Sequence, residues 1–265
     1  MKNSFFLFLS ILLLFTQHAC EKPVLDNPYG DDIIPQITIS NDTPYGSVID
    51  TSEITISWTP NIYAFEFSYM LDPVDTSWSN WNKDTTAYYS YLDEGDYSFY
   101  IKSRYNDTVE IESLDTLTFS VNAISGPGLR IYPLYVKVDN STEFTVEVYA
   151  EEVENLTGAE IILSYNPQLV SLDSTFEGLF LSETQGQTIT ITEHDAETGN
   201  LILTLATAQD GAVGLTGSGS LAGLKFKVNM IGSTQLVLSE NCRLKKDEDL
   251  DVVISSIVNG WVEIK

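Results

Sequence analysis

Hydrophobic and polar side chains alternate along most of this chain, with the two-residue period that is typical of β-strands. The alternating runs are short, and turn-forming pairs such as Asp72-Pro73 separate them. Ser125-Gly126-Pro127-Gly128 divides the runs into two series, so we expect two all-β modules, at residues 36–123 and 126–265. The expected strands are 37–40, 53–59, 65–71, 97–103 and 117–121 in the first module, and 130–138, 143–151, 159–167, 187–193, 200–208, 219–228, 233–240 and 259–265 in the second.

The first module contains the pattern of a tyrosine corner. Leu92, Gly95 and Tyr97 stand in an L-x-x-G-x-Y frame, which opens a strand with Phe99 and Ile101 in alternation. This stretch resembles the entry to strand F of fibronectin type III and immunoglobulin-like domains. The module also resembles the three-tyrosine sandwich domains that accompany bacterial surface and sensor proteins. The resemblance implies an antiparallel β-sandwich with Trp58 in its core.

The second module has enough strands for a jelly-roll sandwich. Its segment EVYAEEVENLTGAEIILSYNPQLVSL resembles the opening of cohesin modules, where a valine-rich strand passes through an N-L-x-G turn into an alternating strand. Asn155, Leu156, Gly158, Tyr165-Asn166-Pro167 and Leu169 take the positions of that pattern. The segments TGSGSLAGLKFKV, STQLVLSE and NGWVEIK then follow in the cohesin order. The expected architecture is therefore a fibronectin III/Ig-like sandwich followed by a cohesin-like jelly roll.

Cohesins are non-catalytic modules in which one sheet face binds a dockerin, a small calcium-loaded helical module of another protein. The resemblance implies that outward residues of two strands bind the partner. We expect them to be Gly158, Glu160, Ile162, Thr204, Ala206, Gln209 and Asp210. If the alternation of the strand that carries Thr204 and Ala206 were shifted by one residue, their neighbours would point outward instead. The alternative to a partner-binding face is a face that is simply solvated.

Charge narrows the range of partners. The chain carries 38 acidic and 13 basic residues, a formal net charge of −25. Nucleic acids and anionic lipid surfaces need clustered Lys and Arg, so we expect no nucleic-acid partner and no membrane contact through protein charge. The acids are expected to keep exposed sheets soluble.

Cysteine and histidine are scarce, which excludes several kinds of site. Cys20, Cys242, His18 and His194 are the only residues of these types, too few for a Cys/His zinc site or several disulfides. If the first twenty residues are removed by processing, a catalytic relay could run only through His194, and we interpret that residue as a solvated loop histidine. No catalytic residue is expected, because nothing marks two of the 38 carboxylates as a glycosidase pair.

The N-terminus reads as an export signal, residues 1–20, with Lys2 before an apolar run too short to span a bilayer. The run ends at Ala19-Cys20, which resembles the lipobox of bacterial lipoproteins, although Gln17 replaces the usual leucine. The resemblance implies lipidation of Cys20, and cleavage by an ordinary signal peptidase is the alternative. Residues 21–35 are polar and proline-containing, so we expect a tether.

Three aromatic residues of the first module, Trp78, Trp81 and Tyr89, are candidates for stacking on sugar rings. Core and loop packing is the alternative for them. The acidic run 247–251 offers oxygen ligands for calcium but lacks the glycine frame of an EF-hand loop, so a solvated loop is the preferred interpretation. We expect no resident cofactor or metal, with calcium entering mainly through a dockerin partner.

These features together predict an exported protein that a lipid anchors to a bacterial membrane, at the outer membrane or cell surface. Its cohesin-like module would recruit a dockerin-bearing protein, such as a polysaccharide-degrading enzyme, or another surface protein. The alternative is a carbohydrate-binding surface lipoprotein that captures polysaccharide.

Overall fold

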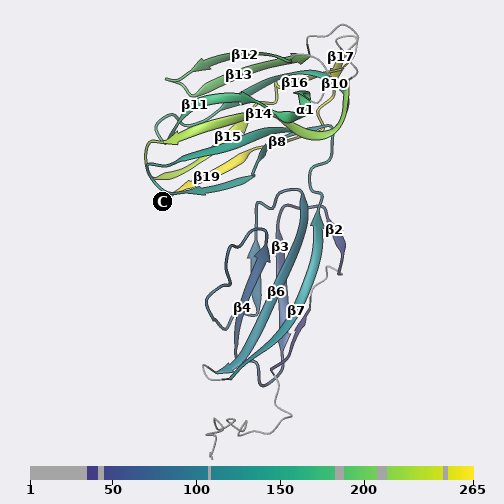
Figure 1. Ribbon diagram of the computed structural model, residues 1–265, viewed down its shortest axis with the longest axis vertical. Coiled ribbons are helices and arrows are strands. Elements are labelled where there is room, and N and C mark those ends of the chain that lie inside the picture. The colour runs from purple at the N-terminus through teal and green to yellow at the C-terminus, as the bar shows by residue number, and fades with distance from the viewer. Residues whose placement is uncertain (1–34, 41–44, 107–108, 183–187, 208–213, 247–249) are drawn as a thin grey trace, which may run out of the picture. The chain divides into compact units, whose positions relative to one another are not determined.

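A computed structural model describes residues 35–265, apart from 41–44, 107–108, 183–187, 208–213 and 247–249 (Figure 1). The described residues form two β-sandwiches, each with its own hydrophobic core. None of the helices among them is long and apolar enough to cross a membrane. The expected signal peptide with Cys20 and the expected tether lie outside the described residues, apart from Pro35 at the end of the tether.

The first sandwich consists of two sheets. One sheet has three strands, in the order β1 (Ile37–Ile39), β3 (Ile54–Pro60) and β5 (Thr86–Tyr89). The other has four, in the order β2 (Ser47–Ile49), β7 (Val109–Val121), β6 (Gly95–Asn106) and β4 (Glu66–Asp72). The sequence pattern did not predict β2 and β5, which are only three and four residues long.

Alternating side chains of both sheets fill the first core. Trp58 is buried and contacts the rings of Phe67 and Phe99, which confirms it as the core tryptophan. The tyrosine corner is also confirmed: the buried Tyr97 donates a hydrogen bond of 2.8 Å from its hydroxyl to the carbonyl oxygen of Asp93. Gly95, at the start of β6, has a φ of 142° that residues with a side chain rarely adopt.

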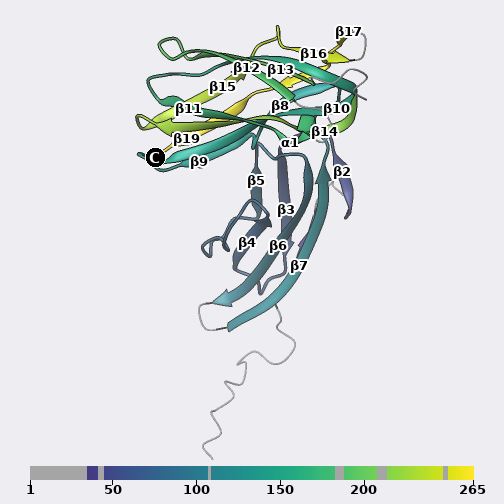
Figure 2. The same cartoon turned by 45° about the horizontal axis from the view of Figure 1, so that its top comes forward.

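The second sandwich is a jelly roll whose strands hydrogen-bond into one 12-stranded sheet, folded over at β10 (Figures 1 and 2). β10 (Glu143–Ser164) takes part in both layers. Its first half pairs with β14 (Leu215–Val228) and β8 (Gly128–Tyr132), and its second half with β13 (Asn200–Thr207) and β16 (Arg243–Lys246). The remaining strands are β9 (Tyr135–Val138), β11 (Val170–Glu177), β12 (Thr188–Asp195), β15 (Gly232–Leu238), β17 (Leu250–Val252), β18 (Ser256–Val258) and β19 (Gly260–Ile264).

The two halves of β10 explain why its sequence reads as two strands. Buried Val146 and Val148 in the first half and Ile161 and Leu163 in the second all enter one core. Register shifts between residues 148 and 156 interrupt the alternation, so the runs 143–151 and 159–167 are parts of one bent strand. The expected run 130–138 is likewise two strands, β8 and β9.

The remaining expected strands are present, whereas β11, β16, β17 and β18 were not predicted. Gly199, with a φ of 73°, lies in the turn between β12 and β13, and the C-terminal β19 buries Val262 and Ile264. A single-turn helix that the pattern did not predict, α1 (Leu179–Ser182), packs Phe180 against Gly219 of β14.

Candidate partner-binding face

The second half of β10 and strand β13 display one face of the second sandwich. Ala159, Ile161 and Leu163 of β10 are buried, so the residues between them point outward, and β13 alternates in the same way. The register opposes Gly158 to Ala206, Glu160 to Thr204 and Ile162 to Ile202. Five of the seven expected partner-binding residues therefore share one side of the sheet by register, although Gly158 is buried there, and no slip of one residue occurs in β13.

The other two expected residues, Gln209 and Asp210, lie outside the described residues. Partner binding by this face stays a prediction, because the positions of these residues do not identify a ligand.

Two neighbouring strands extend this face. On one side, β12 places Ile189 opposite Ala206 and Ile191 opposite Thr204, and both isoleucines are about half exposed, at 51% and 55%. On the other side, β16 places Arg243 opposite Glu160 and Lys245 opposite Gly158. We call this surface the β12–β16 face; the residues that the register places on it are Ile189, Ile191, Glu193, Ile202, Thr204, Ala206, Gly158, Glu160, Ile162, Arg243 and Lys245, of which Gly158 is buried.

The chemistry of the β12–β16 face changes across the strands. It is apolar at Ile189 and Ile191, small at Ala206 and Gly158 in the middle, and cationic on β16. The two middle strands also carry Glu160, Ile162, Ile202 and Thr204, so the centre of the face mixes small, apolar and polar residues. The sequence analysis missed the isoleucines, although the alternation in Thr188–Thr192 already places them on a common side.

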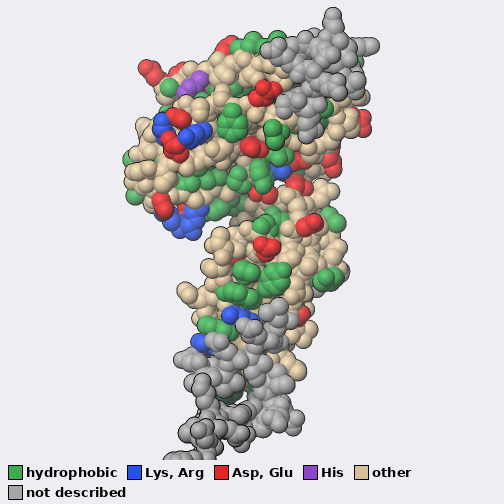
Figure 3. Space-filling view, in the orientation of Figure 1, with side chains coloured by type: hydrophobic (Ala, Val, Ile, Leu, Met, Phe, Trp, Pro, Cys, Tyr) green, Lys and Arg blue, Asp and Glu red, His purple; other side chains and the backbone are tan. Residues whose placement is uncertain are grey.

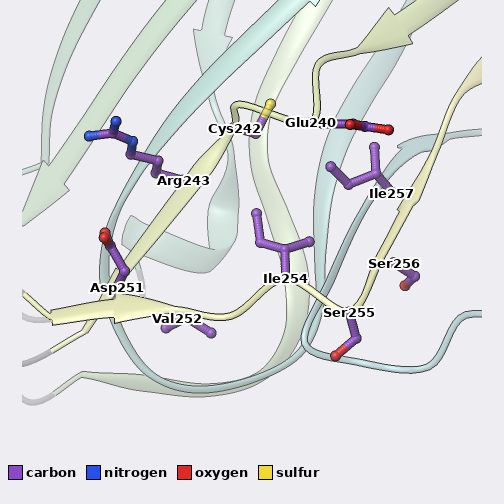
Figure 4. A pocket seen from close by; sticks show the side chains of 9 residues that line it. All are labelled: Glu240, Cys242, Arg243, Asp251, Val252, Ile254, Ser255, Ser256 and Ile257. Carbon is purple, nitrogen blue, oxygen red and sulfur yellow. The ribbon is translucent and has the colours of Figure 1, made fainter.

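Ion pairing holds the β16 side of the face. The ammonium of Lys245 lies 2.9 Å from the carboxylate of Asp251 on β17. That hydrogen bond holds the pKa of Asp251 below its usual range. Asp251 and Arg243 also border a groove of about 550 Å³ between β16, β17 and residues 254–257 (Figure 4).

Cys242 lies at the wall of the same groove, on the opposite side from Asp251 (Figure 4). Its sulfur accepts a hydrogen bond from the backbone N–H of Ile162 at 3.2 Å and donates one to the carbonyl of the same residue. Burial raises the pKa of the thiol. Cys242 therefore ties β10 to the start of β16 and is a structural thiol.

His194 is placed differently from the expectation. It belongs to strand β12 rather than to a loop, and its Nε2 lies 2.7 Å from the hydroxyl of Tyr165. The ring is exposed, as expected of a solvated histidine. The loop interpretation is wrong because β12 continues up to the Gly199 turn.

The aromatic candidates of the first sandwich divide into two groups. Trp78 and Tyr89 line one cavity of about 410 Å³ together with Tyr88 and Asp75, whereas Trp81 does not line it. Tyr89 also packs on the core ring of Phe99 and donates a hydrogen bond of 2.9 Å to the carboxylate of Asp75.

Cations already cover part of both tryptophan rings. The Lys102 ammonium lies 4.7 Å from the ring centre of Trp78 and 5.2 Å from that of Trp81, and Arg104 lies over Trp81. These cation–π contacts fix the loop between β4 and β5 onto the sheet.

Within the part of the chain that the structure describes, no group of three or more His, Cys, Asp or Glu side chains could hold a metal ion. Of the acidic run 247–251, only Leu250 and Asp251 are described, and Asp251 is engaged with Lys245.

Comparison with known families identifies both sandwiches. Residues 135–264 match the Cohesin domain family, and residues 64–122 match the Y_Y_Y domain family. The second sandwich is a cohesin domain. Its match spans the chain from β9 to β19, and therefore includes every strand of the β12–β16 face.

Solved cohesins resemble this chain at low identity. A non-cellulosomal cohesin from Archaeoglobus fulgidus is 18% identical, over 52% of this chain and 90% of its own, with a TM-score of 0.41. The sixth cohesin of scaffoldin B from Acetivibrio cellulolyticus, solved in complex with a Cel5 dockerin mutant, is 17% identical over 53% and 100%, with a TM-score of 0.44. A type II cohesin of the Acetivibrio cellulolyticus cellulosome is 13% identical over 51% and 94%, with a TM-score of 0.43. No curated protein matches the chain.

Proposed function

We propose that this chain is a lipid-anchored surface protein whose cohesin domain binds a calcium-loaded dockerin on another protein. The observation that carries the proposal is the β12–β16 face, an open sheet surface with exposed isoleucines on one side and Arg243 and Lys245 on the other, within a cohesin domain. The proposed role is non-catalytic, as it is for cohesin modules in general. The dockerin would bring a polysaccharide-degrading enzyme to the cell surface.

A binding experiment in the presence and absence of calcium tests this proposal. The full chain with Cys20→Ser is immobilised, and purified dockerins are passed over it in calcium and then in EDTA. We expect at least one dockerin to bind, and its binding to be lost in EDTA because a dockerin is folded by calcium. Failure of every dockerin in a broad set to bind in calcium contradicts the proposal.

Two threonine substitutions locate the binding surface. Thr204→Arg places a bulky cation at the centre of the β12–β16 face, and we expect it to weaken binding at least about tenfold. Thr145→Arg makes the same change at an exposed position on the first half of β10, in the other layer, and should leave binding unchanged. Equal affinities of the two variants would place the dockerin elsewhere.

The anchor is tested separately. We expect the chain made in a bacterium with lipoprotein processing to incorporate labelled fatty acid and to enter the detergent phase on phase separation. Cys20→Ala should abolish both, because acylation needs the thiol of this residue. A wild-type chain that carries no fatty acid would contradict lipid anchoring without affecting dockerin binding.

Saccharide binding by the first sandwich is the second candidate function. The observation in its favour is that Trp78 and Tyr89 share one cavity with the exposed Tyr88 and the carboxylate of Asp75, which is the mixture of flat rings and hydrogen-bonding groups that sugars use. We expect glycan binding, if this function holds, to be lost in Trp78→Ala and kept in Tyr45→Ala, an exposed tyrosine outside the cavity. Absence of binding to an array of plant and microbial glycans contradicts it.

A further inference from the structure

Strand β12 of the cohesin domain is an edge strand with little support. It pairs with β13 along its whole length, and the described strands include no partner for its other edge. Figure 1 shows it as the outermost strand of its sheet. From Ile189 to Asp195 every residue is exposed, on both faces of the strand. The unused backbone N–H and C=O groups of such an edge form a template for another strand.

Two other edge strands of the second sandwich, β11 and β17, carry features that discourage pairing, whereas the first half of β12 does not. β11 carries Asp173 and Glu177 and a register shift after Leu172. β17 is three residues long and carries Asp251. Thr188–Thr192 has no charge, no proline and no register shift, in a chain whose net charge is −25. This stretch therefore lacks the usual protection of an edge.

The same stretch is complementary to itself. If two copies pair antiparallel about a two-fold axis at Thr190, Ile189 of one copy lies opposite Ile191 of the other. Thr188 then lies opposite Thr192, and Thr190 opposite Thr190. Apolar pairs and threonine pairs are both favourable across strands, and the paired stretch contains no charged residue.

We propose that two copies of this chain associate through β12, in the register centred on Thr190, and join their β12–β16 faces into one continuous sheet surface. The strand pair buries less than the roughly 800 Å² per partner of a stable interface, so the dimer is weak in solution. A lipid anchor would concentrate the copies and favour pairing. The proposal does not depend on dockerin binding, because it uses the strand edge rather than the face.

Disulfide trapping tests the register. In the full chain with Cys20→Ser, Thr190→Cys places two thiols opposite each other at the axis, within the Cα separation of roughly 4.4–6.8 Å that a disulfide needs. Thr192→Cys is the matched control, because its two copies would lie about 13 Å apart along the strands. We expect Thr190→Cys to form a covalent dimer at least about tenfold faster than Thr192→Cys. Equal rates overturn the proposal.

Sedimentation equilibrium tests the association without cross-links. We expect a dimer whose dissociation constant falls several-fold between about 50 and 500 mM NaCl, because salt screens the repulsion between two acidic copies. Thr190→Lys places like charges opposite each other and should raise the constant about tenfold, whereas Thr145→Lys, in the other layer, should not change it. A chain that stays monomeric up to millimolar concentration, or a dimer that Thr190→Lys leaves unchanged, overturns the proposal.

Discussion

The hydroxyl of Tyr97 makes a hydrogen bond that stabilises the tyrosine corner of the first sandwich. Its ring is buried and stacked on Phe119, and its hydroxyl donates to the carbonyl oxygen of Asp93. Burial raises the pKa of Tyr97 to about 12, so the hydroxyl keeps its proton and its hydrogen bond at neutral pH. The bond links the start of β6 to the turn that precedes it.

Removing that hydroxyl should therefore destabilise the chain. We expect Tyr97→Phe to lower the free energy of unfolding by about 1 kcal/mol, because the carbonyl of Asp93 loses a buried donor while the ring is retained. Urea denaturation followed by fluorescence measures the change. Tyr88→Phe, which removes an exposed hydroxyl bonded to Glu53, is the control and should cost less than about 0.5 kcal/mol. Equal costs would mean that the corner contributes nothing specific.

The second residue-scale prediction concerns Cys242. Because burial raises its pKa and both thiol hydrogen bonds go to Ile162, the thiolate that reacts with disulfide reagents is scarce. We expect the folded chain with Cys20→Ser to show no fast-reacting thiol with Ellman's reagent, and the same chain to show one equivalent when guanidinium unfolds it. Rapid reaction of the folded chain would show that the groove exposes the sulfur.

At the scale of the element, the bend of β10 from one layer to the other depends on the backbone conformation of the residues between its two halves. Glu152 and Asn155 have positive φ values of 49° and 55°, which let the strand pass from one layer to the other. A β-carbon there crowds the following carbonyl; glycine lacks this atom, and the short polar side chain of asparagine offsets the crowding by local hydrogen bonding. Asn155 also donates its backbone N–H to the hydroxyl of Thr216 on β14.

Substitutions at Asn155 should separate backbone strain from side-chain contacts. We expect Asn155→Gly to retain the stability of the chain within about 0.5 kcal/mol, and Asn155→Val to lower it by about 1–2 kcal/mol. Thermal and urea unfolding of both variants measure the difference. Equal stability of the two variants would mean that the positive φ at residue 155 does not restrict which side chains β10 accepts there.

Alternation predicted the strands whose two faces meet different surroundings. In Glu160–Ser164, Ile161 and Leu163 are buried and their neighbours are partly exposed, so the period of two is visible and placed Glu160 and Ile162 on the outer side. The same is true of β13, with Thr204 and Ala206. Gly158, which was expected on the outer side of β10 as well, is buried. The family resemblance, and not the alternation, suggested which face binds a partner.

Strands without such contrast gave less information. β12 is exposed on both faces, so its alternating Thr and Ile residues do not reveal which side is outer until the register with β13 is known. β2 and β5 are too short to show a period, and the half-buried aromatic residues Trp78 and Tyr89 combine core and surface roles. Sequence alone could not assign these residues to core or surface, because their burial depends on neighbours that are distant along the chain.

At the scale of the whole molecule, negative charge is the main electrostatic feature outside the two cores. The sequence pI is about 4.1, and on the face that Figure 3 shows, acidic side chains are dispersed rather than gathered into one patch. Among the described residues, ion pairs such as Lys225–Glu143 engage some of the carboxylates. The rest repel one another in the folded state more than in the expanded unfolded chain, because folding brings them closer.

Screening should therefore stabilise the fold. We expect the free energy of unfolding at neutral pH, measured with urea, to rise by on the order of 1 kcal/mol between about 10 and 300 mM NaCl, since the Debye length falls from about 30 Å to below 8 Å over that range. Choline chloride is the control for specific cation binding: equal gains in both salts indicate screening, whereas a gain confined to sodium indicates an ion site. A loss of stability with salt would mean that surface ion pairs outweigh repulsion in this chain, despite its net charge of −25.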